Sequence, residues 1–282
     1  GFQNALYSSN TRLHQTLQTD LVLINPQGRN LLNLSSIPRR RLYQAMNVPG
    51  VKSADPLYVK LANWKVPETR RETSIMVLGF NPDRPAFTLP EVNQNLNSIK
   101  LPDTVLFDRA SRGDYQAAIA QIDRGKSVKT EIDRRTITID GLFTIGASFA
   151  ADGALITSDQ NYLRLFPRQD SASVNAGLIQ LQPGADPVQV QQVLKAHLPS
   201  DVKVLTKQEF IEFEKNYWAK NTAIGFVFNL GVAMGFVVGV IIVYQVLSTD
   251  VSDHMAEYAT FKAMGYRNIY LLGIVFEEAI IL

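Results

Sequence analysis

Short apolar runs alternate with turn residues over most of the chain, and this pattern predicts a mixed domain of strands and helices. Leu21–Ile24 is apolar throughout and is followed by Asn-Pro-Gln-Gly, which is typical of a strand and a turn. Asp186 and Pro187 begin a helix, because aspartate caps a first turn and proline is tolerated there. We expect strands over 21–24, 51–66, 74–80, 104–107, 135–141, 155–157, 178–181 and 202–205, with 143–149 as the second arm of a hairpin. We expect helices over 2–18, 40–46, 89–99, 115–122, 159–166 and 187–198. This order predicts an α+β domain over 20–205.

A different pattern follows, because residues 221–249 contain no aspartate, glutamate, lysine or arginine. An apolar helix of roughly 20 residues crosses a bilayer core, so this stretch is long enough to span a membrane. Tyr217 and Trp218 stand at one end, and their amphipathic rings favour the boundary between water and lipid. The alternative is a buried helix of a soluble protein, although core helices are rarely so long and charge-free. We therefore interpret 222–249 as a transmembrane helix.

Gly231, Gly235 and Gly239 recur every four residues within this span. They lie on one face of a helix and form a shallow groove, which lets a second helix approach closely. Glycine is also simply common in membrane helices, which is the alternative explanation. We expect the three glycines to serve transmembrane packing.

The residues before the span carry a helix-start signal. In Thr206-Lys207-Gln208-Glu209 the threonine oxygen can accept from the third residue's N–H while the glutamate reaches back, which is a capping box. No glycine or proline follows until Gly225, so the pattern predicts one helix from Thr206 through the membrane. Its first part, 206–221, is the second of two stalk helices. The first is an amphipathic helix within 1–19, which we expect to follow a membrane span outside this sequence.

Beyond the span, residues 250–268 are polar and 269–282 are apolar again. The second stretch predicts the start of a further transmembrane helix, and we interpret the chain as a fragment of a longer membrane protein. Glu277 and Glu278 fall at membrane depth, where carboxylates are costly and often functional. They could equally face a helix partner or an aqueous gap and only pack there.

Composition narrows the chemistry. The absence of cysteine excludes disulfides, thiol catalysis and cysteine-based zinc sites, and a formal net charge of +2 gives no field that favours nucleic acid. Gly125-Lys126-Ser127 resembles the end of a phosphate-binding loop, but Ala120 stands where that motif needs glycine. The three histidines, His14, His197 and His254, do not have metal-ligand spacing. Acidic pairs such as Asp103 and Asp108 are interpreted as ordinary surface charges. We therefore expect no catalytic residue, no metal and no cofactor.

Residues 253–266 read Asp-His-Met-Ala-Glu-Tyr-Ala-Thr-Phe-Lys-Ala-Met-Gly-Tyr, and this segment resembles the FtsX/MacB-type (type VII) permeases of ABC transporters. The matching positions are Glu257, Ala259, Phe261, Lys262, Ala263 and Gly265. Two further segments, 107–113 and 213–225, are similar to the DevC-like permeases of DevBCA-type exporters. The resemblance covers essentially the whole chain.

The resemblance implies a multi-pass subunit of the inner (plasma) membrane whose large periplasmic domain stands on stalk helices continuous with its transmembrane helices. It implies a permease homodimer, an ABC ATPase subunit at the cytoplasmic face, a membrane-fusion protein of the HlyD/DevB-like kind and a TolC-like outer-membrane channel. ATP hydrolysis would then occur on the partner, so this chain would not be an enzyme. The implied function is to transmit conformational change from the ATPase to the periplasmic domain for export of a glycolipid or a similar amphiphile.

Residues 250–268 are the expected cytoplasmic coupling segment. We expect a short amphipathic helix over 253–265 that ends at Gly265 in a left-handed conformation. Tyr258, Phe261 and Met264 are spaced by three and are expected to share one side. The residues expected to couple to the ATPase are Asp253, Glu257, Tyr258, Phe261, Lys262, Met264 and Gly265. The alternatives are a passive loop between two spans and, for the whole chain, either a membrane receptor with an extracytoplasmic ligand-binding domain or a membrane-anchored enzyme.

Overall fold

The structure, a computed structural model, describes residues 10–148, 151–221 and 223–281. The chain forms two compact units, Gly1–Ala219 (unit 1) and Lys220–Leu282 (unit 2). Within the described residues the strands are β1 (Leu21–Ile24), β2 (Ile37–Pro38), β3 (Val51–Lys65), β4 (Glu72–Phe80), β5 (Thr104–Asp108), β6 (Val128–Ile132), β7 (Arg135–Phe143), β8 (Ala154–Ser158), β9 (Ser173–Val174), β10 (Ala176–Leu181) and β11 (Lys203–Thr206). The helices of unit 1 are η1 (Leu31–Asn33), α2 (Arg40–Met46), α3 (Pro90–Gln94), η2 (Ser98–Lys100), α4 (Gln116–Asp123), α5 (Asp159–Leu165), α6 (Pro187–His197) and α7 (Lys207–Lys220). The expected α+β fold class is confirmed.

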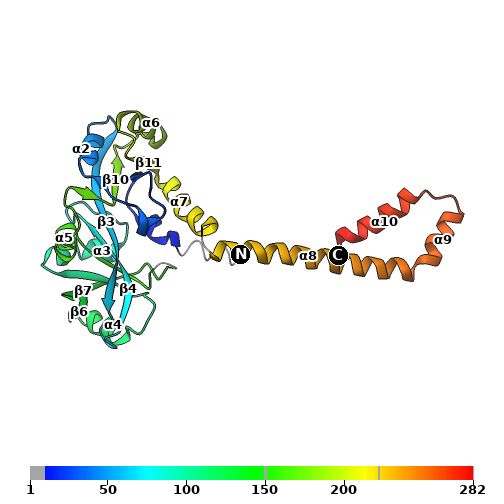
Figure 1. The fold of residues 1–282 in the computed structure, drawn as a ribbon, viewed down its shortest axis with the longest axis horizontal. Coiled ribbons are helices and arrows are strands. Elements are labelled where there is room, and N and C mark those ends of the chain that lie inside the picture. Colours follow the sequence, from blue (N-terminus) through cyan, green and yellow to red (C-terminus); the bar gives the residue numbers. More distant parts are fainter. Residues whose placement is uncertain (1–9, 149–150, 222, 282) are drawn as a thin grey trace. The chain divides into compact units, whose positions relative to one another are not determined.

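Unit 1 is built on one mixed sheet in the order β11-β1-β10-β3-β4-β8-β5-β7-β6. The pairs β4–β8 and β5–β7 are parallel, and the other neighbours are antiparallel. The long strand β3 runs the length of the unit, with α2 and α6 near one end and α4 near the other (Figure 1). The last strand, β6, also pairs with β3 through Trp64↔Ile132 and Lys65↔Glu131. The sheet therefore closes on itself at this end, and the strand edge there is covered.

Two buried clusters lie on the two faces of the sheet. Leu21 and Leu23 belong to one cluster, whereas Val22 and Ile24 belong to the other, because successive side chains of a strand point to opposite faces. Helices α2, α4, α5 and α6 contribute to the first cluster. Residues 10–17, η1, α3 and α7 contribute to the second. Both faces are thus covered, so β1 is apolar throughout instead of alternating with polar residues.

Local signals place several elements where we expected them. Ser158 caps α5 by accepting from the Asn161 N–H, and Asp186 caps α6 by accepting from the Val188 N–H, with Pro187 at the first position. In α6 the apolar Val193 is exposed, whereas the polar Gln191 is buried. The hairpin expectation is wrong. β7 pairs with β6, which precedes it, through a two-residue turn, and 144–148 form no strand.

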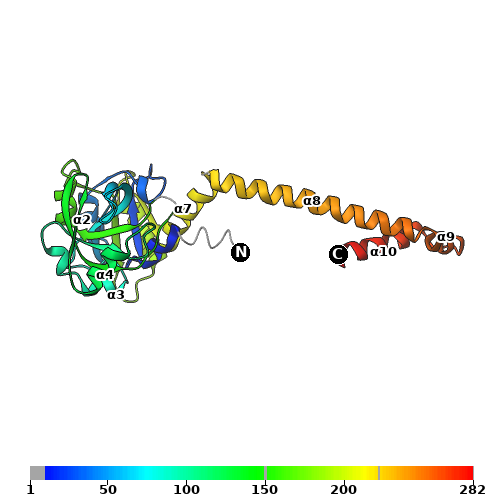
Figure 2. The ribbon, with the colours of Figure 1, turned by 90° about the horizontal axis from the view of Figure 1, so that it is seen from below.

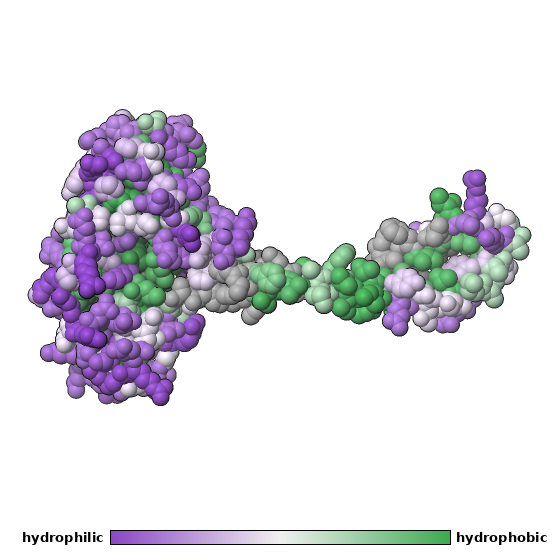
Figure 3. All heavy atoms as spheres, viewed as in Figure 1, coloured by the Kyte–Doolittle hydropathy of each residue, from purple (hydrophilic) through white to green (hydrophobic). Residues whose placement is uncertain are grey.

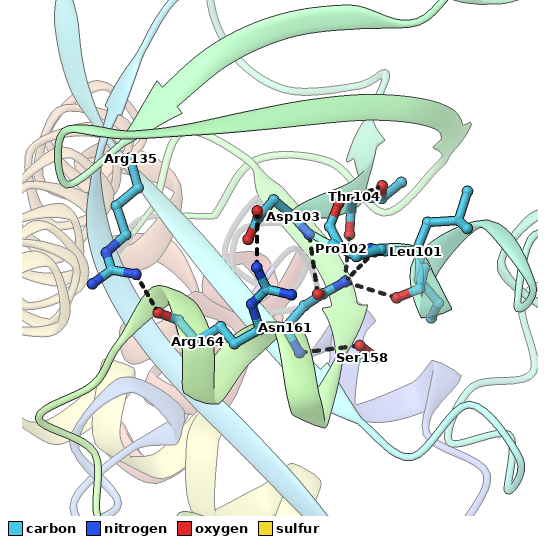
Figure 4. A network of polar contacts seen from close by, with 9 residues as sticks. Leu101, Pro102, Asp103, Thr104, Arg135, Ser158, Asn161 and Arg164 are labelled. Atoms are coloured by element: carbon cyan, nitrogen blue, oxygen red, sulfur yellow. Dashed lines mark hydrogen bonds and ion pairs between the residues drawn. The ribbon is translucent and has the colours of Figure 1, made fainter.

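Asn161 in α5 ties several loops of unit 1 together (Figure 4). Its buried Nδ2 group donates to the carbonyl oxygens of Ile99 at 2.9 Å and Leu101 at 2.8 Å, and its Oδ1 accepts from the Asp103 N–H at 3.1 Å. All three bonds go to backbone groups of one loop, and the Ile99 carbonyl oxygen among them is buried. The side chain therefore fixes the loop between η2 and β5 against α5.

The capping box at the start of α7 is confirmed. Glu209 N donates to Thr206 Oγ1 at 3.1 Å, and Thr206 N donates to Glu209 Oε2 at 2.8 Å. The expectation of one helix from Thr206 through the membrane is wrong. Helix α7 ends at Lys220, Asn221 is a bend, and the next helix, α8, is Ala223–Asp253. The sequence contains no helix breaker here, but asparagine and threonine at 221 and 222 have low intrinsic helix propensity. Thr222 itself lies outside the described residues.

Unit 2 consists of α8, α9 (Met255–Ala263) and α10 (Asn268–Ile281). Among the described residues, one helix is long and apolar enough to cross a membrane, Phe226–Asp253, and its apolar window is not buried within the chain. Figure 2 shows α8 as one unbroken helix, and Figure 3 shows hydrophobic residues over its middle part. At about 1.5 Å per residue its 31 residues extend about 46 Å. Helix α10 contacts α8, so the two apolar helices are neighbours.

Candidate functional site

The segment between α8 and α10 has a well-defined end. Gly265 has φ +93°, which confirms the expected left-handed cap. Its N–H donates to the Lys262 oxygen at 3.1 Å, and the Tyr266 N–H donates to the Phe261 oxygen at 3.2 Å. The Phe261 and Tyr266 rings also meet edge to face, 5.7 Å apart. This pair of backbone bonds with its apolar contact is the Schellman motif, which satisfies the last carbonyls of α9 and turns the chain toward α10.

The side chains of the coupling segment do not share one side, which corrects the expectation for Tyr258. Tyr258 and Lys262 line an apolar groove of about 570 Å³, which Leu271 and Val275 of α10 also line. Phe261 packs on Tyr266, and Met264 lies beyond the end of α9 and is exposed. The spacing by three fails because side chains three apart drift around a helix of 3.6 residues per turn. The groove and the exposed end of α9 are thus two surfaces.

Charged side chains cluster where α8 meets α9. His254 Nδ1 lies 3.3 Å from Glu257 Oε1, and its Nε2 lies 3.8 Å from Asp250 Oδ1. The hydrogen bond and charge of Glu257, with the charges of Asp250 and Asp253, raise the pKa of His254 above its ordinary value. The imidazole thereby offsets part of the negative charge that Asp250, Asp253 and Glu257 bring to this junction. Sequence reasoning missed His254, although its position three residues before Glu257 is a helical contact spacing.

The three glycines of α8 form an open strip. A side chain added at Gly231, Gly235 or Gly239 would meet nothing within 4 Å, so the fold of a single chain gives no reason for them. A concave strip of about 490 Å³ on α8 includes Gly239 together with Phe236 and Val240, but neither of the other glycines. Glu277 is an exposed residue of α10. Glu278 lies in the same helix, but its side chain is outside the part that the structure describes.

Asp108 is not a surface charge, and that interpretation is wrong. Its side chain is fully buried, and its Oδ1 accepts from the N–H groups of Ala110 at 3.0 Å and Ile145 at 3.1 Å. Its Oδ2 accepts from the Gly146 N–H at 2.7 Å. Burial raises the pKa of Asp108, while the three N–H groups and the charge of Arg12 oppose the rise. The 107–113 segment, which carried part of the family resemblance, therefore has a structural role. Through Asp108 it holds residues 145–146 against the end of β5.

The 213–225 segment also contains a buried acid. Glu214 Oε2 accepts from the Leu31 N–H at 2.8 Å, and its Oε1 accepts from Trp218 Nε1 at 2.8 Å. His14 Nε2 lies 3.4 Å from Glu214 Oε2, within ion-pair range, but the geometry does not make a hydrogen bond. The His14 ring also packs 4.7 Å from the Phe210 ring. These contacts fasten residues 10–16 to α7, which leads directly toward unit 2.

Sequence reasoning missed both buried acids because the groups that hold them are distant in the chain. Ile145 is 37 residues from Asp108, and Leu31 is 183 residues from Glu214. A local signal existed at Asp108, since Asp-x-Ala with a following serine is a turn in which the carboxylate accepts the N–H two residues on. Within the described ranges, no group of three or more histidine and acidic side chains is arranged to hold a metal ion.

No family model matches this sequence, and no curated protein does. The periplasmic region of MacB from Actinobacillus actinomycetemcomitans matches with a TM-score of 0.45 and 9% identity, over 72% of this chain and 96% of that one. The extracellular domain of the noncanonic ABC-type transporter YknZ from Gram-positive bacteria matches with a TM-score of 0.42 and 15% identity, over 67% and 100%. A domain of a protein described as a permease from Porphyromonas gingivalis matches with a TM-score of 0.39 and 14% identity, over 68% and 89%.

Proposed function

We propose that this chain is the permease subunit of an ATP-driven exporter of the FtsX/MacB type. The observation that carries the proposal is the order of the elements around α8. A folded α+β unit leads through the capped helix α7 to an exposed apolar helix of membrane-spanning length. The short helix α9 then ends at Gly265 in the segment that resembles the family, and the apolar helix α10 follows.

The finer proposal is a DevBCA-like system of the inner membrane, with a separate ABC ATPase, a membrane-fusion protein and a TolC-like channel as partners. Glu214, Trp218 and the His14 contact support a mechanical role, because they fasten two segments of unit 1 through α7, the helix that precedes α8 in the chain. A movement of α7 would be transmitted to residues 10–16 and to η1 through these contacts. The exported molecule would be a glycolipid or a similar amphiphile.

A receptor would instead be expected to continue from α8 into a long polar output region. The described chain returns to an apolar helix after α9, beginning at Asn268, which favours a multi-pass transport subunit. An ATPase can move a distant unit only through a contact that differs between its nucleotide states. The end of α9 and the groove beside it are the surface that we assign to this contact.

The double variant Glu257→Lys with Phe261→Ala tests the assignment. It removes the acid beside His254 and the ring that packs on Tyr266 at the α9 end. We expect the permease to remain folded and inserted, while transport and its stimulation of ATP hydrolysis fall together by about tenfold or more. The measurement is ATP hydrolysis and export by the complex reconstituted in vesicles.

The control is Glu212→Lys, the same charge reversal in α7, where the exposed Glu212 lies 3.8 Å from Lys215 and accepts from Gln208 Nε2 at 3.5 Å. It should leave both activities within about twofold, since an exposed pair of this kind contributes little. If the double variant still binds the ATPase and stimulates it as the wild type does, the coupling role of 253–265 is wrong.

A further inference from the structure

A further concave surface lies on unit 1, on residues that the coupling role does not use. It is a cleft of about 460 Å³ at the place where β3 pairs with β6. The β6–β7 turn forms one wall, and the loop after α5 forms another, with Phe166 and Arg168. A volume of this size accommodates a small molecule or a headgroup.

Of the three acidic side chains in this cleft, Glu131 is the one with cation partners. Glu131 pairs with Lys65 at 2.6 Å and with Arg70 at 2.5 Å, and these two hydrogen bonds lower its pKa. Asp133 accepts from the Asn63 N–H at 3.1 Å. Glu72, at the edge, is the remaining acid of the lining. Five lysine and arginine side chains line the cleft against these three acids, so the lining carries a net positive charge.

Four cations lack a carboxylate partner. Among the described residues, Arg134 and Arg168 make no side-chain hydrogen bond or ion pair, and both are exposed. Lys60 Nζ lies 4.5 Å from the centre of the Phe166 ring. Arg135 donates one N–H to the Arg164 carbonyl oxygen at 2.7 Å, as Figure 4 shows. Its other N–H groups are available to a ligand. These four cations are thus not paired with the acids of the cleft, and Lys60 and Arg135 are also positioned by their contacts.

The turn that carries Arg134 is strained. Asp133 has φ +46° and Arg134 has φ +68° in a two-residue turn between β6 and β7. Such turns favour Asn-Gly, because both positions need positive φ, which is unfavourable for a residue with a side chain. Arginine therefore stands where glycine would suit the backbone better, and its guanidinium adds a cation to the cleft.

We propose that this cleft binds a compact organic phosphate, with Arg134 and Arg168 as the forked donors and Lys60 and Arg135 beside them. Phosphate oxygens match the fixed fork of a guanidinium, and a small cleft with several cations suits charge concentrated on one group. An acidic peptide spreads its charge along an extended chain and would need a longer groove. The proposal rests on unit 1 alone and does not depend on the coupling role.

Arg134→Gly tests the site without harming the fold, since it relieves the turn while removing one cation. The full chain is placed in nanodiscs of zwitterionic lipid and titrated with glycerol phosphate, and in parallel it is mixed with vesicles that contain phosphatidylglycerol. We expect Arg134→Gly to weaken binding about tenfold, with a melting temperature that is unchanged or raised. Arg168→Gln is the second variant and should weaken binding similarly.

Arg124→Ala is the control, because Arg124 is an exposed arginine at the end of α4 and outside the cleft. It should bind as the wild type does. Wild-type binding of glycerol phosphate supports a soluble phosphate ester as the ligand, and binding of vesicles alone supports a lipid headgroup. The site is wrong if the wild type binds neither probe, if both cleft variants bind like the wild type, or if a polyglutamate peptide binds where neither phosphate does.

Discussion

Asp108 illustrates how one side chain can organise a region without taking part in chemistry. A carboxylate with three backbone N–H donors keeps 145–146 in place beside the end of β5. Ser111 adds to the same turn by donating its hydroxyl to the backbone carbonyl oxygen of Asp108 at 2.6 Å. A side chain added at Gly153 would meet Ser111 Oγ at 1.9 Å, so glycine is required where this turn packs.

Asp108→Asn should destabilise unit 1, although it removes a buried charge. An amide has one acceptor oxygen, so its NH₂ group would face one of the three N–H donors and leave that donor without a partner. An unsatisfied buried donor costs about 1–3 kcal/mol, and thermal or urea unfolding would measure the loss. Asp123→Asn is the control, because Asp123 forms an exposed pair with Arg109 that contributes little. Equal stability of both variants would show that the three bonds to Asp108 contribute nothing.

Among the elements, α8 is the one whose sequence is not explained by contacts within the chain. Its glycines are open to the surroundings, and its apolar side chains are exposed over the length of a bilayer core. Glycine is also a poor helix former, by about 1 kcal/mol relative to alanine. A row of three such residues therefore needs a reason outside the single chain, and close packing of a second helix supplies one.

Gly235→Leu should distinguish a role of this glycine in the fold of the single chain from a role in packing between two chains. The fold of the single chain should be unchanged, because the added side chain meets no atom within 4 Å. Association of two permease chains should weaken, since leucine would hold the helices apart. Cysteine crosslinking along α8 in membranes measures the association, and Ala233→Leu, on another face, is the control. Efficient crosslinks only through Phe236 or Val240 would remove the glycine row from the interface.

In the whole molecule, the two units differ in what stabilises them. Both buried clusters of unit 1 lie within residues 13–210, and the sheet that carries them is complete in that unit. Unit 2 has no buried residue among those that the structure describes, so its apolar helices depend on a surrounding membrane or partner chain. Unit 1 has the properties of an independently folding domain.

Residues 10–219 expressed alone should therefore fold without detergent. Because the core and sheet of unit 1 are complete within this range, its melting temperature should match that of unit 1 in the full chain within about 5 °C. Calorimetry of both proteins, with hydrogen exchange to assign the transition, makes the comparison. A truncated protein that aggregates or lacks protected strands would show that unit 1 needs unit 2 or the membrane to fold.

The sequence alone determined those features that depend on residues a few positions apart. The caps at Ser158, Asp186 and Thr206, the left-handed Gly265 and the apolar length of α8 each follow from local hydrogen bonding or local apolar content. Most strands were also predictable, because their apolar runs are bounded by turn residues. These features do not depend on the rest of the fold, because the residues that form them are close together in the chain.

Only the tertiary structure decided which polar groups are buried and which surfaces are concave. Glu214 meets His14 across 200 residues, β6 closes the sheet on β3, and the basic cleft draws its walls from β3, the β6–β7 turn and the loop after α5. No local pattern encodes such contacts, because each needs two distant segments to be brought together before the interaction exists. The bend at Asn221 is another feature that the local pattern did not predict, since an uninterrupted helical pattern did not yield one uninterrupted helix.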